Sequence, residues 1–172
     1  MRIEKDFAEL LQLFDKHKVK YCILGAFAVA FYAEPRYTKD MDILVEPTVD
    51  NGRRIIRALN EFGLGHLGLK EVDFCQKEKF FQLGYEPVRV DLLTSIQGME
   101  FNDLWKRRIQ GKYGKQKVSF ISLNDLIKSK QIANHKQDIA DLEKLEQVKI
   151  RKKSKIVLCV SDSASPKCFR PV

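Results

Sequence analysis

The stretch that decides the fold is YCILGAFAVAFYAEPRYTKDMDILV, residues 21–45. Segment 19–24 is rich in β-branched and aromatic residues and stops at Gly25, which predicts a short buried strand. Residues 26–33 are apolar and precede a proline, which predicts a helix that ends there. Residues 40–45, Asp-Met-Asp-Ile-Leu-Val, begin by alternating polar and apolar side chains, which predicts a second strand with carboxylates on one face.

The remaining sequence continues this alternation of helices and strands. Apolar residues recur every three or four positions in segments 3–18 and 50–62, which predicts amphipathic helices, the second capped by Asp50. Further strands are predicted at 79–83, 88–93 and 117–121, and further helices at 101–108, 122–134 and 136–147. The pattern predicts one α/β (α+β) domain, a small mixed β-sheet flanked by helices with a helical C-terminal segment.

The positive charge of the chain is concentrated at its C-terminal end. The 172 residues include 31 Lys and Arg against 23 Asp and Glu, a formal net charge of +8. Segment 149–172 holds seven basic residues and one acidic residue, which leaves 24 basic and 22 acidic residues in segment 1–148. We therefore expect a nearly neutral domain over 1–148 and a basic, flexible tail over 149–172.

Several classes of protein are disfavoured by what the sequence lacks. The longest uncharged apolar run, 23–32, is too short to cross a bilayer, so no membrane association is expected. Without a secretory leader, we expect a cytoplasmic protein. The four cysteines and three histidines have no zinc-ligand or nucleophile–base spacing, which argues against a zinc site and against a Ser-His or Cys-His nucleophile.

Three carboxylates stand out because of the strands that carry them. Asp40 and Asp42 are two residues apart on a predicted strand, so both side chains leave the same face. Asp91 lies within the predicted strand 88–93, where an unpaired acid is costly to bury. A single such acid is commonly a solvent-facing residue, but grouped carboxylates repel one another and favour a bound cation, with Mg²⁺ or Mn²⁺ as the natural occupant.

A possible phosphate site lies at the junction of the first strand and the helix after it. Gly25 allows a close approach of the backbone, and the first N–H groups of a helix attract anions. Taken alone, a glycine at such a junction is more often only a turn.

Together these residues resemble a known signature. Gly25-Ala26, followed after thirteen residues by Asp40-Met-Asp42-Ile, is similar to the motif of the DNA polymerase beta-type nucleotidyltransferase superfamily. The stretch 24–42 resembles more narrowly its small stand-alone bacterial branch, which includes AbiEii-type toxins and minimal nucleotidyltransferases. Segment 90–95 is similar to that branch's third-carboxylate strand, and segment 122–142 to its C-terminal helices.

The resemblance implies a metal-dependent enzyme that moves a nucleoside monophosphate from an NTP to an acceptor hydroxyl and releases pyrophosphate. Asp40, Asp42 and Asp91 would be the catalytic residues and the ligands of Mg²⁺ or Mn²⁺. It also implies a toxin–antitoxin or phage-defence setting with an antitoxin partner. The residues matched to nucleotide binding are Gly25, Ala26, Arg36, Thr38, Lys39, Lys130, Asp138 and Asp141.

Other functions stay open at the level of sequence. The same fold could serve as a regulatory module that binds nucleotide or RNA without turnover. An aminoglycoside-type adenylyltransferase is disfavoured because no second substrate-binding domain follows the core. Segment 106–117 holds six basic residues and could follow an RNA backbone, although a solvated helix and loop is the more ordinary interpretation. The acceptor can be RNA, protein or a small molecule.

Overall fold

The computed structural model of the protein describes residues 4–34, 38–85, 88–134 and 136–161. Its strands are β1 (Tyr21–Ile23), β2 (Asp40–Val45), β3 (Phe80–Tyr85), β4 (Val88–Leu93), β5 (Ile109–Tyr113) and β6 (Gln116–Phe120). Its α-helices are α1 (Lys5–Lys16), α2 (Gly25–Tyr32), α3 (Val49–Glu61), α4 (Phe101–Arg107), α5 (Leu123–Ala133) and α6 (Lys136–Ser161). Two short 3₁₀ helices, Gly65–Leu67 and Glu71–Cys75, follow α3.

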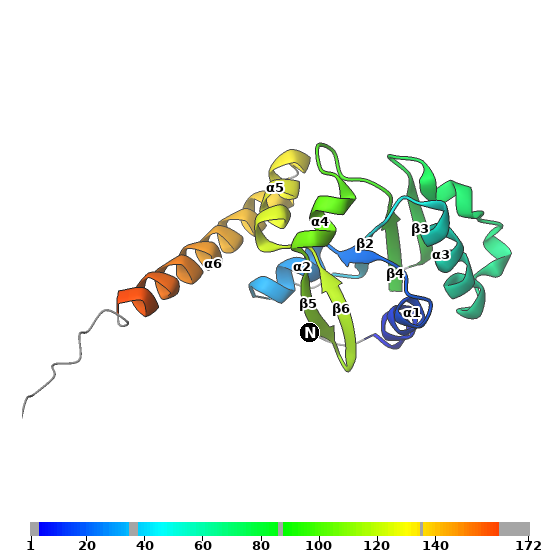
Figure 1. Ribbon diagram of the computed structural model, residues 1–172, viewed down its shortest axis with the longest axis horizontal. Helices are drawn as coiled ribbons and strands as arrows, with labels where there is room; N and C mark the ends of the chain where they lie inside the picture. Colours follow the sequence, from blue (N-terminus) through cyan, green and yellow to red (C-terminus); the bar gives the residue numbers. More distant parts are fainter. Residues whose placement is uncertain (1–3, 35–37, 86–87, 135, 162–172) are drawn as a thin grey trace, which may run out of the picture.

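The six strands form one mixed sheet in the order β3-β4-β2-β1-β6-β5 (Figure 1). The central strand β2 is parallel to β4 and antiparallel to β1, and β1 is parallel to β6. The hairpins β3–β4 and β5–β6 complete the two edges. Helices α1 and α3 contact each other toward one end of the molecule, and α5 and α6 contact each other at the other end (Figure 1). The predicted fold class, a mixed sheet flanked by helices, is confirmed.

The core explains why β2 can present carboxylates. Met41, Ile43 and Val45 leave the opposite face of β2 from Asp40 and Asp42, and all three are fully buried in the hydrophobic core. Burial of side chains of this size stabilises the fold by about 1.5–3 kcal/mol each. The alternation in the sequence therefore fixes which face of the strand the acids leave.

An aromatic cluster joins the elements that surround β1. The ring of Phe27 in α2 meets Phe7 of α1 edge-on at 5.6 Å and Tyr113 of β5 at 5.9 Å, measured between centroids. Such pairs contribute about 0.5–1.5 kcal/mol beyond their buried area. The cluster anchors the short helix α2, whose first residue is part of the candidate site.

Two details differ from the sequence-based expectations. Segment 106–117 contains most of the hairpin β5–β6 and not only a helix and loop; Tyr113 is the only buried residue of β5, so the alternation expected of a strand is hidden in the sequence. The cap of α3 is Thr48 and not Asp50, because the Thr48 hydroxyl accepts the N–H of Asn51 at 3.2 Å. Asp50 lies in the first turn and pairs with Arg53.

The C-terminal helix is longer than predicted. Helix α6 continues without a break to Ser161 and projects away from the sheet (Figure 1), so the end expected at residue 147 is wrong. The division between a domain and a tail at residue 148 stays a prediction, and segment 162–172 lies outside the described residues. Within the described part of the chain, no helix combines the length and apolarity needed to cross a membrane.

Asn51 fixes α3 to the edge of two central strands. Its side chain is fully buried; Oδ1 accepts the N–H of Lys20 at 2.8 Å, and Nδ2 donates to the carbonyls of Lys20 at 3.0 Å and Glu46 at 3.1 Å. The three bonds satisfy backbone groups just before β1 and just after β2. The carbonyls of Lys20 and Glu46 also accept the N–H groups of Glu46 at 3.1 Å and Thr48 at 2.9 Å. Loss of the Asn51 amide therefore removes two of their bonds, takes the partner of the Lys20 N–H and leaves a cavity at a fully buried position.

We therefore expect Asn51→Ala to lower the free energy of unfolding by about 2–4 kcal/mol, measured by urea denaturation. Asn102→Ala, at an exposed position of α4, is the matched control and should change it by less than about 0.5 kcal/mol. Equal effects of the two substitutions would contradict this role of Asn51.

Candidate active site

The register between β2 and β4 brings the three predicted acids together. Asp42 lies directly opposite Asp91, and Asp40 lies opposite Arg89. Neighbours across parallel strands leave the same face of the sheet, and so do residues two apart on one strand. Asp40, Asp42 and Asp91 therefore share one face, although 49 residues separate Asp42 from Asp91 along the chain.

An arginine that the sequence reasoning missed lies among these acids. Nη2 of Arg89 donates to Oδ2 of Asp40 at 2.7 Å and to Oδ2 of Asp91 at 3.0 Å. One guanidinium nitrogen thus joins carboxylates from two strands. The signal was present in the sequence, because Arg89 stands two residues before Asp91 on the same strand and must leave the same face.

Crowding of negative charge changes the acidity of the cluster. The pKa of Asp42 is raised to about 6, first by burial and then by the charges of Asp91 and Asp40, against the lowering influence of Lys130 and Arg89. Burial also raises the pKa of Asp91, and its ion pair with Arg89 opposes that shift. Raised carboxyl pKa values in a cleft are typical of functional sites.

The donor set suits a hard divalent cation, but the geometry is not preformed. In the described residues, Oδ1 of Asp40 and Oδ1 of Asp91 are buried and have no hydrogen-bond partner. Carboxylate oxygens are the preferred ligands of Mg²⁺ and Mn²⁺. Across the same residues, no three acidic, histidine or cysteine side chains already stand close enough to hold a metal ion. The Arg89 guanidinium between Asp40 and Asp91 gives a physical reason for this.

The helix α2 begins beside the acids. Gly25 adopts φ +60°, and a Cβ at this position would collide with the carboxylate of Asp42. Only glycine therefore allows Asp42 to lie against the start of α2. The side chain of Ala26 is buried, so this residue can contact a ligand only through its backbone. The first N–H groups of α2 face no side-chain cap, which leaves a partial positive charge near the carboxylates.

A cleft of about 400 Å³ opens next to Gly25 and Asp42. Its other walls come from the segment after β4 and from the helices α5 and α6. The lining residues are Leu24, Gly25, Asp42, Leu93, Ser95, Ile96, Gln97, Leu126, Ser129, Lys130, Ile132, Ala133 and Asp138. The cleft therefore joins the first motif to two residues, Lys130 and Asp138, that the resemblance matched to nucleotide binding.

Lys130, Asp138 and Asp141 form a buried ionic cluster between α5 and α6. Nζ of Lys130 lies 2.7 Å from Oδ1 of Asp138 and 2.8 Å from Oδ2 of Asp141, and each residue is less than 10% exposed. Asn134, which is left-handed at φ 49°, ends α5 and lets α6 turn back. The cluster fastens α6 to α5. Lys128 lies two residues before Lys130 on α5, so it leaves another side of the helix, and it is exposed.

The segment before β2 holds three of the residues that the resemblance matched to nucleotide binding, Arg36, Thr38 and Lys39. The hydroxyl of Thr38 donates to the carbonyl of Asp40 at 3.3 Å and accepts its N–H at 3.4 Å, so Thr38 shapes the start of β2. Lys39 is exposed beside Asp40, and its carbonyl accepts the N–H of Arg89. Arg36 lies outside the described residues.

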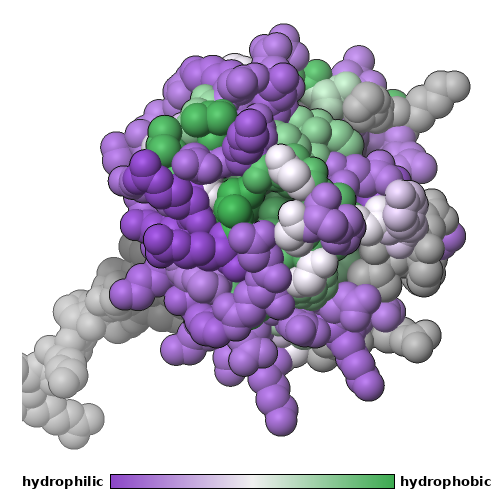
Figure 2. Space-filling view, turned by 90° about the vertical axis from the view of Figure 1, so that its right-hand side faces the viewer, coloured by the Kyte–Doolittle hydropathy of each residue, from purple (hydrophilic) through white to green (hydrophobic). Residues whose placement is uncertain are grey.

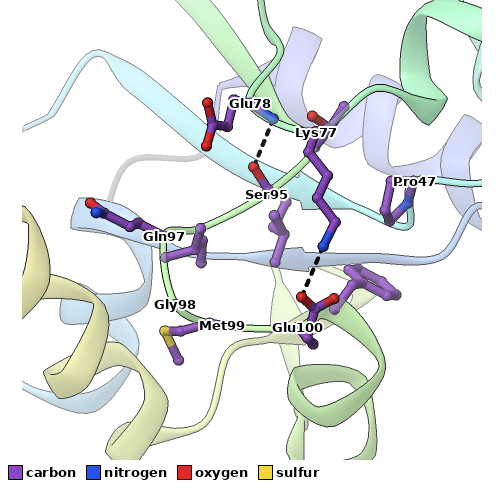
Figure 3. Close-up of a pocket in the computed structure, with 12 residues that line it drawn as sticks. Pro47, Lys77, Glu78, Ser95, Gln97, Gly98, Met99 and Glu100 are labelled. Atoms are coloured by element: carbon purple, nitrogen blue, oxygen red, sulfur yellow. Dashed lines mark hydrogen bonds and ion pairs between the residues drawn. The ribbon is translucent and has the colours of Figure 1, made fainter.

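A second cavity, of about 190 Å³, lies where β2 and β4 end (Figure 3). Lys77 and Glu100 form an ion pair at 2.9 Å at its edge, and Ser95 accepts the N–H of Glu78 at 2.8 Å. None of the predicted site residues in the described ranges lines it. Ser95, Ile96 and Gln97 line both cavities, so this short segment separates them.

The face that carries the acids continues from Asp91 onto the edge strand β3. Gln82 lies opposite Asp91 on the edge strand β3, shares its face and is exposed. Phe80, on the same face, is 55% exposed. Figure 2 looks at the end of the molecule where α3 and the 3₁₀ helices after it lie in Figure 1, and it shows a hydrophobic area surrounded by hydrophilic side chains. Asp91 itself is only 3% exposed, so the exposed side chains of β3 border a buried acid.

Comparisons with known proteins agree with this geometry at the level of fold. No protein-family model matches the chain, and no curated protein matches it significantly. A solved structure of a candidate nucleotidyltransferase from Thermotoga maritima is similar with a TM-score of 0.52 at 15% identity, over 86% of this chain and 91% of that one.

Two structures of the antibiotic-resistance factor ANT(2″)-Ia are similar as well. Its solution structure gives a TM-score of 0.53 at 12% identity, over 92% of this chain and 95% of that one. Its crystal structure with adenylyl-2″-tobramycin gives a TM-score of 0.52 at 13% identity, over 87% and 96% of the two chains. The expectation of a nucleotidyltransferase-like fold is confirmed, and its narrower assignment to the AbiEii-like branch stays a prediction.

Proposed function

We propose that the protein is a metal-dependent nucleotidyltransferase that moves a nucleoside monophosphate from an NTP to an acceptor hydroxyl. The observation that carries the proposal is the convergence of Asp40, Asp42 and Asp91 on one face, next to the helix start at Gly25. Phosphoryl-type transfer requires stabilised negative charge and two oxygens held in line. This corner of the sheet offers oxygen ligands, the N–H groups that begin α2 and a cleft in one place.

Each part of the corner has a distinct task in this proposal. Asp40 and Asp42 would hold the cation, with Asp91 as a further ligand. A bound Mg²⁺ or Mn²⁺ would neutralise charge on the phosphates and on the leaving pyrophosphate. The N–H groups that begin α2 would receive the triphosphate, and the cleft toward α5 would receive the nucleoside. Asp91, whose pKa is raised by burial, is suited to accept the proton of the attacking hydroxyl.

The cluster around Lys130 has a supporting part in the proposal. Lys130 and Asp138 line the cleft, yet the ammonium of Lys130 is engaged by two carboxylates. We therefore assign to Lys130, Asp138 and Asp141 the task of holding α5 and α6 in place as the nucleoside wall. Direct contact with a nucleotide is left to the groups that face the cleft from α2 and from the segment after β4.

A small-molecule acceptor becomes as reasonable as RNA or protein. The sequence reasoning disfavoured an antibiotic-type adenylyltransferase because no second domain follows the core. ANT(2″)-Ia aligns with this chain over 95% of its own length, so a single unit of this size can be an antibiotic-resistance factor of the fold. The lack of a second domain after the core is therefore no reason to disfavour an antibiotic-type adenylyltransferase, and a small-molecule acceptor stays open beside RNA and protein. The toxin–antitoxin setting and the cytoplasmic location stay predictions.

The function is tested with α-³²P-labelled ATP, GTP, CTP and UTP in the presence of Mg²⁺ or Mn²⁺. Acceptors are total RNA, total protein and a panel of hydroxylated antibiotics. We expect label transfer with one of these classes and its loss in Asp42→Ala. Specific nucleotide binding without transfer to any acceptor would favour a regulatory module, and label transfer that persists in Asp42→Ala would contradict the site.

A change at Asp42 should also alter the stability of the metal-free protein. Because its pKa is about 6 in the folded chain and 3.8 ordinarily, the unfolded chain holds fewer protons between these values. The free energy of unfolding therefore falls as pH rises from about 4 to about 6. Asp42→Asn removes this cost and should raise stability at pH 8 by about 1–2 kcal/mol, measured by thermal denaturation in EDTA.

Asp103→Asn, on the exposed side of α4, is the matched control and should leave stability nearly unchanged. A loss of stability in Asp42→Asn at pH 8 would contradict the view that burial and the neighbouring acids disfavour its ionised form.

Metal binding should depend on pH in the opposite sense. Below pH 6 a proton competes with the cation for Asp42, since the pKa of this group is about 6. We expect the Mg²⁺-induced rise in melting temperature to be largest above pH 7 and to disappear near pH 5. A rise that is the same at pH 5 and pH 8 would place the cation elsewhere.

A further inference from the structure

We propose that Arg89 is a resident cation of the carboxylate cluster, which joins Asp40 to Asp91 in the metal-free protein and leaves Asp40 when a divalent cation binds. The inference rests on the metal site of the proposed function and assigns a task to a residue outside it. Metal binding would then be an exchange of one cation for another. Arg89 would set how tightly the metal is held.

The contacts support an exchange more than a simple surface ion pair. A single nitrogen, Nη2, reaches one oxygen of Asp40 and one oxygen of Asp91, at 2.7 and 3.0 Å. The other oxygen of each carboxylate is buried and, within the described residues, lacks a hydrogen-bond partner. The guanidinium thus occupies one oxygen of each acid. The second oxygen of each acid stays available as a metal ligand, because no hydrogen-bond donor of the described chain reaches it.

The positions of the carboxylates give a second argument. With Arg89 in place, the described acids do not form a three-ligand metal site, although the strand register puts Asp40, Asp42 and Asp91 on one face. A divalent cation shared by carboxylates of both strands would compete with Nη2 for the same oxygens. An arginine cannot give up its proton in a protein, so it can yield only by moving its charged group.

The side chain of Arg89 has room for that movement. It is 26% exposed, and Asp40 is 31% exposed, whereas Asp91 is only 5% exposed. The bond to Asp40 is therefore on the solvent side of the cluster and is the one that breaks more readily. A guanidinium released there keeps its planar donors close to the start of β2, where it can meet phosphate oxygens of a bound triphosphate.

The experiment measures Mn²⁺ binding to the metal-free full chain at pH 8 by electron paramagnetic resonance of the free ion, without nucleotide. We expect Arg89→Met to bind Mn²⁺ roughly tenfold more tightly than the wild type, because a competing charge within a few ångströms is removed. Arg89→Lys keeps the charge and should stay close to the wild type. Arg53→Met removes an exposed arginine of α3 and should leave the affinity unchanged.

Two results would overturn the inference. Mn²⁺ binding by Arg89→Met that equals or is weaker than that of the wild type would mean that Arg89 does not compete with the metal. Mn²⁺ binding by Arg53→Met that is as tight as that of Arg89→Met would mean that overall charge alone sets the affinity. If Arg89→Met does not fold, the Nε–Hε resonance of Arg89 in the wild-type chain decides: it must shift when Mg²⁺ saturates the protein, and an unchanged resonance refutes the exchange.

These outcomes remain separate from those of the proposed function. Tighter Mn²⁺ binding by Arg89→Met, together with no nucleotidyl transfer by the wild type, would support the exchange of Arg89 for the metal and contradict the proposed enzymatic activity. Nucleotidyl transfer that depends on Asp42, with an Mn²⁺ affinity that Arg89→Met does not change, would support the proposed activity and contradict the exchange of Arg89 for the metal.

Discussion

The parallel pairing of β2 with β4 is the constraint on which the candidate site depends. It sets Asp42 opposite Asp91, so that acids far apart in the chain crowd on one face of a sheet whose other face is core. A shift of one residue would send Asp91 into the core and bring Val90 or Leu92 to the carboxylates. Burial of the apolar side chains and crowding of the acids are therefore two results of one register.

The negative charge of crowded carboxylates must be offset by positive charge, and three parts of the protein contribute it. Arg89 reaches two of the acids directly, Lys130 lowers the pKa of Asp42 from across the cleft, and the start of α2 adds the partial charge of its N–H groups. The pKa of Asp42 is nevertheless raised to about 6, first by burial and then by the charges of Asp91 and Asp40. Residual negative charge of this kind attracts a cation together with its phosphate ligand, which is the physical link between the fold and the proposed chemistry.

Alternation along single strands made much of the site predictable. The pattern of Asp40, Asp42 and the apolar residues between them indicates the acid face directly, and Gly25 is needed because of how close Asp42 comes. The position of Arg89 follows from the same rule, because it lies two residues before Asp91 on one strand, although its ion pairs with two acids do not. The hairpin at β5 was missed because its polar residues conceal the period of a strand.

Contacts between distant segments were beyond such rules. The pairing of Lys130 with Asp138 and Asp141 depends on the turn at Asn134, whose left-handed backbone sets how α6 returns along α5. The two cavities that share Ser95, Ile96 and Gln97 likewise arise from packing of a loop against helices. Sequence spacing alone does not fix either arrangement, because both result from tertiary contacts.

The most direct test of the account is a crystal structure of the protein with Mn²⁺ and a non-hydrolysable NTP, in which anomalous scattering locates the metal. The account predicts Mn²⁺ between the carboxylates of Asp40, Asp42 and Asp91, the triphosphate at the start of α2, and the guanidinium of Arg89 withdrawn from Asp40. Anomalous density elsewhere, with the Arg89 bridge intact and the nucleotide bound away from Gly25, would contradict it.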